Sequence, residues 1–579
     1  MTTLLEESDR SHDISQPLEK LSDDETLKTN SNQLRGTIAQ GLIAELTAAV
    51  PGTDIKLMKF HGIYQQDNRD IRDERRRQRL EPAFAFMVRV RLPGGVLTPA
   101  QWLKLDALGR AYGGETLRLT TRQTFQFHGV LKQNLRPLMK GLRDVGLDSR
   151  AACGDDSRGV MCSVHPQLSA LHAQIYAMAK AASDHAIPKT GAYREIWYEE
   201  EPEARDPSKP EEPLYGRSYM PRKFKIGFVL PPLNDIDIYA QDLGFIAIAP
   251  KGKLEGFNVV IGGGMGRTDQ APETYPRLAS LIGFVPVDRV TEVIDATMEI
   301  QRDFGDRADR MHARFKYTID DKGLDAIKAG IEARQGFAFE EAREAILTSN
   351  GDQYGWQRGE DGREHYTLFI ENGRVINHEG RPLMDALRAI AQVHKGTLRV
   401  TPNQNLIIAD VDPKDRPTIE KLLNENGLGD ANRLSALRLN SMACVALPTC
   451  GLAMAESERY LPKLVTKMEA ILSAHGLIDE PITIRMTGCP NGCSRPYIAE
   501  VALTGRAPGK YNLYFGGGFH GQRLNKMYLE NVGEEAILGA FEKVAAHFAR
   551  DRQPGEHFGD FAIRTGYVAE VKEGRHFND

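Results

Sequence analysis

An internal repeat is the feature of this 579-residue sequence that most constrains its fold. Residues 117–130 read LRLTTRQTFQFHGV, and residues 398–411 read LRVTPNQNLIIADV. Each segment follows a similar lead-in, which predicts an alternating strand, a turn with glycine and an amphipathic helix. The lead-ins begin at Phe86 and Thr367, and their helices are expected at residues 100–112 and 381–393. The repeat therefore predicts two copies of a strand–helix–strand unit.

A second pair of similar segments follows the two copies. GKLEGFNVVIGGGMGR begins at Gly252, and GKYNLYFGGGFHGQR begins at Gly509. Between the markers, residues 224–235 and 484–495 each predict a strand that runs into a turn. Because three markers recur in the same order, we expect an α+β fold that is internally duplicated about a pseudo-twofold axis. Such a duplication creates a seam between its halves, where a large cofactor can bind.

The chain is too long for one hydrophobic core, so several domains are expected. Its first 32 residues hold eight acids and three bases, and this difference of −5 equals the net charge of the whole chain. The remainder is therefore neutral, which argues against a duplex nucleic-acid partner. We expect five parts: a disordered acidic arm (1–34), an extension that wraps the core or contacts a partner (35–85), a shared repeat domain (86–150 with 357–431), a first cofactor domain (151–356) and a second cofactor domain (432–579).

No stretch approaches the roughly 18 uninterrupted apolar residues that a membrane helix needs. The N-terminus is acidic and polar, without the basic and apolar regions of a secretory signal. The sequence therefore predicts a cytoplasmic location and no membrane partner.

Four of the six cysteines lie within one fifty-residue stretch, in the pattern Cys444-x5-Cys450 and Cys489-x3-Cys493. Four thiolates on two separated turns suit a metal ion or an iron–sulfur cluster. The first spacing is wide for structural zinc, so the cluster is favoured over zinc, and buried inert thiols rank below both. The turn CPNGC would bring two sulfurs to one side, where backbone N–H groups stabilise their negative charge. The remaining Cys153 and Cys162 are expected to be buried apolar thiols.

The motifs CVALPTC (444–450) and TGCPNGC (487–493) resemble the cluster signature of sirohaem-dependent sulfite and nitrite reductases. The resemblance covers nearly the whole chain from about residue 34, including the repeat. It implies ferredoxin-like repeat halves in a three-domain architecture around a sirohaem seam. It also implies that Cys444, Cys450, Cys489 and Cys493 hold a [4Fe–4S] cluster, and that Cys493 binds the sirohaem iron as well.

Polar and cationic side chains recur at every second position of the first repeat segment, so we expect them on one face of one strand. This face could simply be solvated, or it could bind an anionic cofactor. The resemblance implies the second role, in which the sirohaem carboxylates are bound by Arg118, Thr120, Arg122, Gln126 and His128, together with Asn491.

Four further cations are candidates for binding the substrate, although a lysine on an edge strand often serves only to prevent aggregation. The resemblance implies that Arg89, Arg158, Lys223 and Lys225 bind sulfite above the haem and assist its reduction. Members that reduce nitrite often have Asn at the second lysine position, so the pair Lys223 and Lys225 favours sulfite, with nitrite as the alternative. The implied activity is the six-electron reduction of sulfite to sulfide, in assimilatory sulfur metabolism and cysteine biosynthesis.

Two rival functions come from other classes. The string Gly516-x-Gly518-x-x-Gly521 matches a dinucleotide motif, but no βαβ unit completes it, so we expect close-approach turns near the sirohaem. A non-catalytic scaffold could use the acidic arm and the Arg-rich residues 71–79, which we expect to form a solvated helix. Segments near Arg35 and Lys59 resemble the form that is paired with an NADPH-oxidising flavoprotein subunit, and a ferredoxin-linked form is the alternative.

Overall fold

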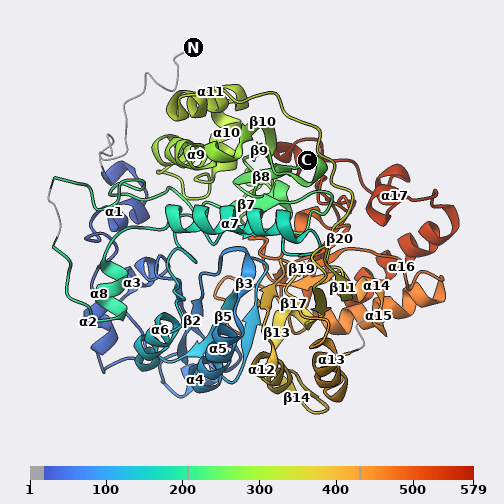
Figure 1. Cartoon of the computed structure of the whole chain (residues 1–579), viewed down its shortest axis with the longest axis horizontal. Coiled ribbons are helices and arrows are strands. Elements are labelled where there is room, and N and C mark those ends of the chain that lie inside the picture. The colour runs from blue at the N-terminus through green and yellow to red at the C-terminus, as the bar shows by residue number, and fades with distance from the viewer. Residues whose placement is uncertain (1–17, 205–207, 430–432) are drawn as a thin grey trace.

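The structure is a computed structural model, and it describes residues 18–204, 208–429 and 433–579 (Figure 1). Its fold is α+β and internally duplicated, as predicted from the repeat. In these ranges the strands form four five-stranded sheets and one two-stranded sheet. The four large sheets are two related pairs, one in the repeat region and one in the cofactor domains.

The two repeat sheets are antiparallel, and one edge strand of each sheet comes from the other copy. Strand β13 (Arg374–Val375) belongs to the second copy along the chain but pairs with β4 (Leu117–Leu119) of the first. Strand β3 (Val96–Leu97) of the first copy pairs with β16 (Thr397–Val400) of the second. The copies are therefore interlocked. In spatial order the sheets are β1 (Ile63–Asp67), β2 (Phe84–Arg89), β5 (Phe125–Val130), β4 (Leu117–Leu119), β13 (Arg374–Val375), and β11 (Gly355–Arg358), β12 (Glu364–Leu368), β17 (Leu406–Val411), β16 (Thr397–Val400), β3 (Val96–Leu97).

The two helices predicted from the repeat are present as α5 (Pro99–Tyr112) and α12 (Leu383–Val393), and they pack against each other. Thr98 caps the N-terminus of α5, where its side chain accepts a hydrogen bond from the backbone N–H of Gln101 in a capping box. Trp102 and Leu105 lie on its buried face. Amphipathic spacing thus identified these helices correctly.

The closing segment of the first copy is a hairpin, and the prediction of one continuous strand is wrong. Strands β4 and β5 are antiparallel, and the turn between them is closed by a hydrogen bond of 2.9 Å from the N–H of Thr120 to the carbonyl of Thr124. Gln123 adopts a φ of 54°, which reverses the chain direction. Polar residues recur at alternate positions through the turn as well as in the strands, so the sequence pattern did not reveal the turn.

The two cofactor-domain sheets share one topology. In each sheet the first three strands are parallel and the last two are antiparallel. In chain order they are β6 (Met161–Cys162), β7 (Ile226–Val229), β8 (Leu243–Ile248), β9 (Gly256–Ile261), β10 (Ser280–Pro286), and β18 (Ser441–Ala443), β19 (Ile484–Thr487), β20 (Val501–Ala507), β21 (Lys510–Phe515), β22 (Lys526–Val532).

The glycine runs form the same turn in both halves. Gly262 and Gly516 have φ of 83° and 93°, and a Cβ on Gly263 or Gly517 would lie within 2.2 Å of a backbone carbonyl oxygen. After Gly516 the chain continues into β22, an antiparallel strand and not a helix, so the βα unit of a dinucleotide site is absent from this described segment.

Residues 18–34 differ from the predicted disordered arm, of which residues 1–17 lie outside the described residues. Helix α1 (Asp23–Thr29) packs onto the protein, with Glu25 and Lys28 buried. The ammonium group of Lys28 donates to Glu25 at 2.6 Å and to the carbonyl of Met220 at 2.7 Å. Composition indicated a solvated arm, but opposite charges on α1 and the core compensate one another on burial.

The extension that follows α1 also joins the main core, through Ile38, Leu57 and Ile63. Helix α4 (Arg72–Arg77) has no buried residue, so the prediction of a solvated helix is confirmed. The remaining helices are α2 (Ile38–Ile43), α3 (Gly52–Leu57), α6 (Leu135–Arg143), α7 (Ser169–Ala186), α8 (Ala192–Trp197), α9 (Val290–Phe304), α10 (Phe315–Lys322), α11 (Leu324–Gln335), α13 (Arg416–Glu425), α14 (Ala436–Leu439), α15 (Leu461–Ala474), α16 (Glu534–Asp551) and α17 (Phe558–Arg564).

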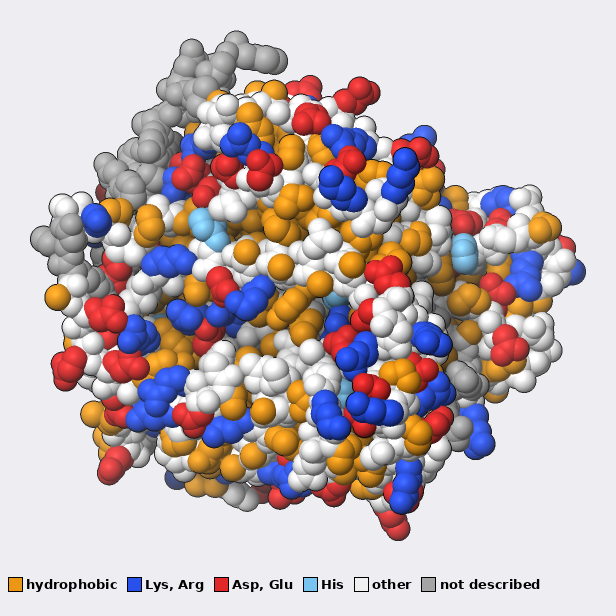
Figure 2. Space-filling view, in the orientation of Figure 1, with side chains coloured by type: hydrophobic (Ala, Val, Ile, Leu, Met, Phe, Trp, Pro, Cys, Tyr) orange, Lys and Arg blue, Asp and Glu red, His pale blue; other side chains and the backbone are white. Residues whose placement is uncertain are grey.

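The largest hydrophobic core joins both repeat sheets and the first cofactor domain, and a second core lies within residues 437–568. The exact domain boundaries stay predictions. Acidic and basic side chains are interspersed over the face shown in Figure 2, which lacks a large patch of one sign among its described residues. None of the described helices is both long enough and apolar enough to cross a bilayer.

Candidate active site at the seam between the two halves

The four clustered cysteines lie beyond the ends of two neighbouring parallel strands. Strands β18 and β19 pair with Ala443 opposite Met486, so Cys444 and Cys489 follow at the same edge of the sheet. The turn that carries Cys489 and Cys493 contains Gly492 at a φ of 66°. Of the six cysteines, all of which the structure describes, Cys493 alone is exposed.

Nearby donors point at the sulfurs. The N–H of Gly488 donates to the Cys444 sulfur at 3.3 Å, and the amide of Asn491 donates to the Cys489 sulfur at 3.5 Å. Burial, and then the neighbouring Cys493, raise the pKa of Cys450 to about 11 and that of Cys489 to about 12. A bound cation would offset both effects and favour the thiolates.

Within the described ranges, we find no group of three or more metal-binding side chains close enough to share one ion. A single-ion site such as structural zinc is therefore not preformed. A cluster of four irons needs a wider arrangement, because each thiolate then binds a different corner. Gly488, which donates to the Cys444 sulfur, directly precedes Cys489, so the two cysteine segments lie side by side.

A row of polar side chains crosses the first repeat sheet. Arg89, Gln126, Arg118 and Arg374 are successive cross-strand partners on β2, β5, β4 and β13, so they share one face. With its amide oxygen turned toward Arg89, Gln126 accepts from that guanidinium at 3.1 and 2.6 Å. Of the five residues predicted to share one face, Arg118 and Gln126 therefore do so, on two neighbouring strands.

Arg118 is already engaged by protein groups. Its Nη2 donates to the carbonyls of Asn372 at 3.1 Å and Ala443 at 2.9 Å, and its Nε lies 3.0 Å from Glu458. Because Ala443 precedes Cys444, these contacts hold the entry to the cysteine loop. A contact of Arg118 with a cofactor stays a prediction.

Arg158, Lys223 and Lys225 come from two adjacent segments. Ser157 and Phe224 form a parallel bridge, and the residues on either side of each bridge partner project to the opposite face. Lys223 and Lys225 therefore lie beside Arg158. Neither ammonium group has a hydrogen bond or an ion pair with the described residues.

Burial, and then the nearby Arg314, lower the pKa of both lysines well below the usual range. Arg122 and Arg158 add to this repulsion, and burial lowers the pKa of Arg122 to about 9. A group of partly buried cations that repel one another binds an anion favourably, since the anion relieves the repulsion.

Two further arginines at the seam, Arg267 and Arg314, were not predicted as site residues from the sequence. Arg314 pairs with Asp242 at 3.2 Å, and no local pattern marked it. The backbone N–H of Arg267 donates to the carbonyl of Pro490 at 3.1 Å. Its place directly after the first glycine run was a usable signal, because that run packs against the CPNGC turn.

Buried hydrogen-bond donors that lack an acceptor in the protein indicate whether these residues fit an anionic cofactor. Such donors occur at several places among the described residues, and four of them gather at this seam, on three arginines and on His128, whose pKa burial lowers well below its usual value. Unpaired buried donors are costly, so a site with several of them favours a ligand that accepts hydrogen bonds. The atoms are Arg122 Nε, His128 Nδ1, Arg267 Nε and Arg314 Nε.

The predicted cofactor contacts that remain are Thr120 and Asn491. The Thr120 hydroxyl accepts from the N–H of Arg122 at 3.2 Å, within the hairpin turn. The carbonyl of Asn491 lies 3.1 Å from the position that a Cβ on Gly266 would take, so this turn touches the first cofactor domain.

The isolated cysteines are both buried, as predicted, but they differ. Arg89 donates to the Cys153 sulfur at 2.9 Å, so this thiol is part of the polar network around a predicted substrate cation. Burial raises the pKa of Cys162, which has no such cation contact. The expectation of a purely apolar environment is therefore wrong for Cys153.

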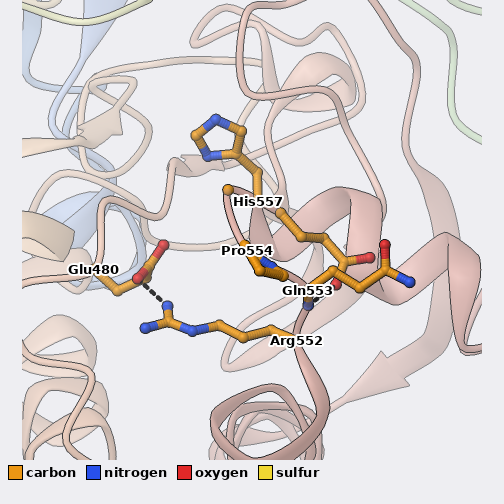
Figure 3. A pocket seen from close by; sticks show the side chains of 7 residues that line it. Glu480, Arg552, Gln553, Pro554 and His557 are labelled. Carbon is orange, nitrogen blue, oxygen red and sulfur yellow. Dashed lines mark hydrogen bonds and ion pairs between the residues drawn. The ribbon is translucent and has the colours of Figure 1, made fainter.

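A surface hollow of about 410 Å³ lies beside the C-terminal end of α16 (Figure 3). Arg552 pairs with Glu480, as the dashed line in Figure 3 marks, and Glu556 pairs with Arg564. The hollow contains none of the predicted site residues. Its lining residues are Glu480, Arg552, Gln553, Pro554, Gly555, Glu556 and His557.

Two family descriptions match the chain. The nitrite and sulphite reductase 4Fe-4S domain matches residues 177–339, and the nitrite/sulfite reductase ferredoxin-like half domain matches residues 78–145 and 357–426. The chain belongs to this family of nitrite and sulfite reductases.

Curated relatives match the chain over its full length under the name "sulfite reductase [NADPH] hemoprotein beta-component". The protein from Nitrobacter hamburgensis is 72% identical over 99% of each chain, and that from Nitrosomonas europaea is 65% identical over 100% of each. The protein from Staphylococcus carnosus is 54% identical, over 96% of this chain and 98% of the relative. The NirA protein of Mycobacterium tuberculosis shares the fold, with a TM-score of 0.77, 24% identity, and coverage of 97% of this chain and 99% of that one.

Proposed function

We propose that this chain is the haem-bearing component of a sulfite reductase, which reduces sulfite to sulfide with six electrons. The observation that carries the proposal is the surplus of partly buried cations beside the four cysteines, in which the ammonium groups of Lys223 and Lys225 have no described partner. Full-length relatives that bear the name of sulfite reductase components support it.

The proposed cofactors are sirohaem and a [4Fe–4S] cluster. Cys444, Cys450, Cys489 and Cys493 would hold the cluster, and Cys493 would also bind the sirohaem iron, in keeping with its exposed position. The sirohaem carboxylates would be bound by the orphaned donors of Arg122 and His128, together with Arg118, Thr120, Gln126 and Asn491. When bound, this pair of cofactors supplies single electrons to the substrate.

The protein side chains bind the anion and handle protons. Arg89, Arg158, Lys223 and Lys225 would hold the substrate oxygens, and their positive charge favours departure of each oxygen as water. The lowered pKa of each lysine makes its Nζ a better proton donor than an ordinary lysine. Partial burial reduces the screening of these charges by bulk water.

The relatives are named as beta-components that use NADPH, so they act with a further component. We propose that this component is a flavoprotein that oxidises NADPH and passes electrons to the chain. The glycine run leads into a strand and offers no nicotinamide site in the described part of the chain, which supports a separate donor. The cytoplasmic location stays a prediction.

The test is to purify the chain, record its visible spectrum and measure sulfide production. We expect sirohaem bands, labile sulfide from the cluster, and sulfite reduction with an artificial dye donor. Addition of the flavoprotein should replace the dye with NADPH. A colourless protein would contradict the proposal, preferential nitrite reduction would change its substrate, and activity only with reduced ferredoxin would change its donor.

A further inference from the structure

Asp237 and Arg495 occupy equivalent positions in the two halves. Asp237 lies eight residues after the end of β7 at Val229, and Arg495 lies eight residues after the end of β19 at Thr487. Both adopt left-handed backbone conformations, with φ of 50° and 53°. Each directly precedes a short 3-10 turn, Ile238–Ala240 or Pro496–Ile498.

These equivalent residues contact each other. The Nε of Arg495 donates to the Asp237 carboxylate, and Arg485 donates to the same carboxylate at 2.7 and 3.3 Å. Asp237 is fully buried, and both guanidinium groups are nearly so. Residues that meet their own equivalents lie at a twofold axis, so this ion pair marks the pseudo-twofold axis of the chain.

The other two nitrogens of Arg495 join the repeat copies. Nη1 donates to the carbonyl of Thr121 at 2.7 Å, and Nη2 donates to that of Pro402 at 3.1 Å. Thr121 and Pro402 are the second residues of the two equivalent turns, TTRQT and TPNQN. One side chain thus ties both repeat turns to the segment that carries the last cysteine.

The same contacts restrain Cys493. Its carbonyl accepts a hydrogen bond of 3.0 Å from the hydroxyl of Thr121, and Arg495 follows two residues later. Asp237 stays ionised, because Arg485 and Arg495 lower its pKa against the opposing effect of burial. Two guanidinium groups and one carboxylate leave one positive charge in excess beside this turn.

We propose that Arg495 is a positioning residue, held by Asp237, that fixes the backbone of Cys493 and places an excess positive charge near its sulfur. The inference rests on the proposed function, in which Cys493 joins the cluster and the sirohaem iron. It predicts that the ion pair sets both the geometry of that sulfur and the reduction potential of the centre bound there.

The first test is Asp237→Asn in the holoenzyme. Loss of the carboxylate leaves both guanidinium charges uncompensated, so the midpoint potential should move to a more positive value. Loosening of the Cys493 turn should also alter the electron paramagnetic resonance and visible spectra. Turnover with a dye donor should fall about tenfold, as is typical when a group that orients a metal ligand is removed.

Asp303 provides a matched control, because it is a buried carboxylate with two arginine partners. It accepts from Arg302 at 2.7 and 3.1 Å and from Arg334 at 2.7 Å, on α9 and α11. Asp303→Asn should lower thermal stability but leave the potential and spectra of the holoenzyme unchanged. If Asp237→Asn behaves in the same way, the ion pair is merely structural and the proposal is wrong.

A second variant decides the matter if Asp237→Asn does not assemble. Thr121→Val removes only the hydroxyl that donates to the Cys493 carbonyl, and it should produce a smaller change in the same spectra. Unchanged spectra and potential would overturn the proposal. Absence of sirohaem bands from the wild-type protein would instead contradict the proposed function, so the two failures are distinguishable.

Discussion

The two repeat turns, residues 120–124 and 401–405, have similar backbone conformations, but their side chains have different hydrogen-bond partners. Each is closed by a backbone hydrogen bond of 2.9 Å between its first and last residues. Each has a glutamine with positive φ at the fourth position, 54° at Gln123 and 70° at Gln404. The turns therefore show how a duplicated unit can diverge without a change of fold.

Three side chains of the second turn share one acceptor within the protein. The buried carboxylate of Asp352 accepts hydrogen bonds from Thr401 at 2.6 Å, Asn403 at 3.0 Å and Asn405 at 2.7 Å. The first turn keeps unpaired donors, on Arg122 in the turn and on His128 in the strand after it. In the second turn the side chain that lacks a partner is the neutral amide of Gln404. The first turn thus leaves a charged donor for an anionic ligand, whereas the second leaves an uncharged amide.

The largest effect is expected when the last cysteine is replaced, and replacement of its counterpart in the first half serves as the control. Cys493 and Asp235 each lie six residues after the end of an equivalent strand, β19 or β7. Cys493→Ser should lose sirohaem absorbance and cluster iron together, because one sulfur would serve both. Asp235→Asn should retain both, since its carboxylate only accepts from Ser163 and the N–H of Val164. Normal haem and iron content in Cys493→Ser would refute the bridging role.

Lys225→Asn should give the next largest effect. Removal of one cation from the substrate group should slow sulfite reduction on the order of a hundredfold, or about 3 kcal/mol. Nitrite carries a single charge and should be affected less. Turnover of both anions is compared at equal sirohaem occupancy, with the exposed lysine variant Lys253→Asn as the control. Equal losses for both anions would leave Lys225 as a general cation without a role in selectivity.

Arg122→Asn makes the first turn resemble the second, which has Asn403 at this position. We expect sirohaem to bind roughly tenfold more weakly, because a charged hydrogen bond of about 1.5 kcal/mol is lost. Reconstitution of the haem-free protein with sirohaem, followed by absorbance, measures the change. Arg363→Asn, which removes a half-exposed surface ion pair with Asp412, is the control. Unaltered affinity in Arg122→Asn would show that the turns do not differ in ligand binding.

Asp352→Asn should have the smallest effect on the cofactors. It removes the charged acceptor of the closed turn, so thermal unfolding should show a loss of about 2 kcal/mol. Sirohaem content and the spectrum should not change. A loss of sirohaem without a loss of stability would show that the second turn also serves the cofactor, and the contrast between the turns would then fail.

The sequence predicted those parts of the fold that depend on periodic patterns. The helices α5 and α12 follow from their amphipathic spacing, and the duplication follows from the repeated strands and glycine turns. The hairpin was missed because the positive φ of Gln123 leaves no mark on the alternation of polarity. The packing of α1 was missed because composition does not reveal that Glu25 pairs with Arg307 and that Lys28 donates to the carbonyl of Met220.

The sequence could suggest site residues where they form a local motif, as the cysteines and the two lysines do. Arg314 was not predictable, since it reaches the seam only through the packing of α10 and pairs with Asp242, 72 residues away along the chain. Cys153 was misjudged for a similar reason, because its contact with Arg89 joins residues 64 apart. Long-range contacts of this kind depend on the tertiary fold.

The ion pair between Asp237 and Arg495 also favours the pairing of a first half with a second half over the pairing of two like halves. Two copies of the first half would bring two carboxylates together at the axis, and two copies of the second would bring two guanidinium groups together. Either arrangement buries like charges, which costs several kcal/mol. Opposite charges at one pair of equivalent positions therefore disfavour homodimers of either half, and they favour the pairing of each first half with a second half.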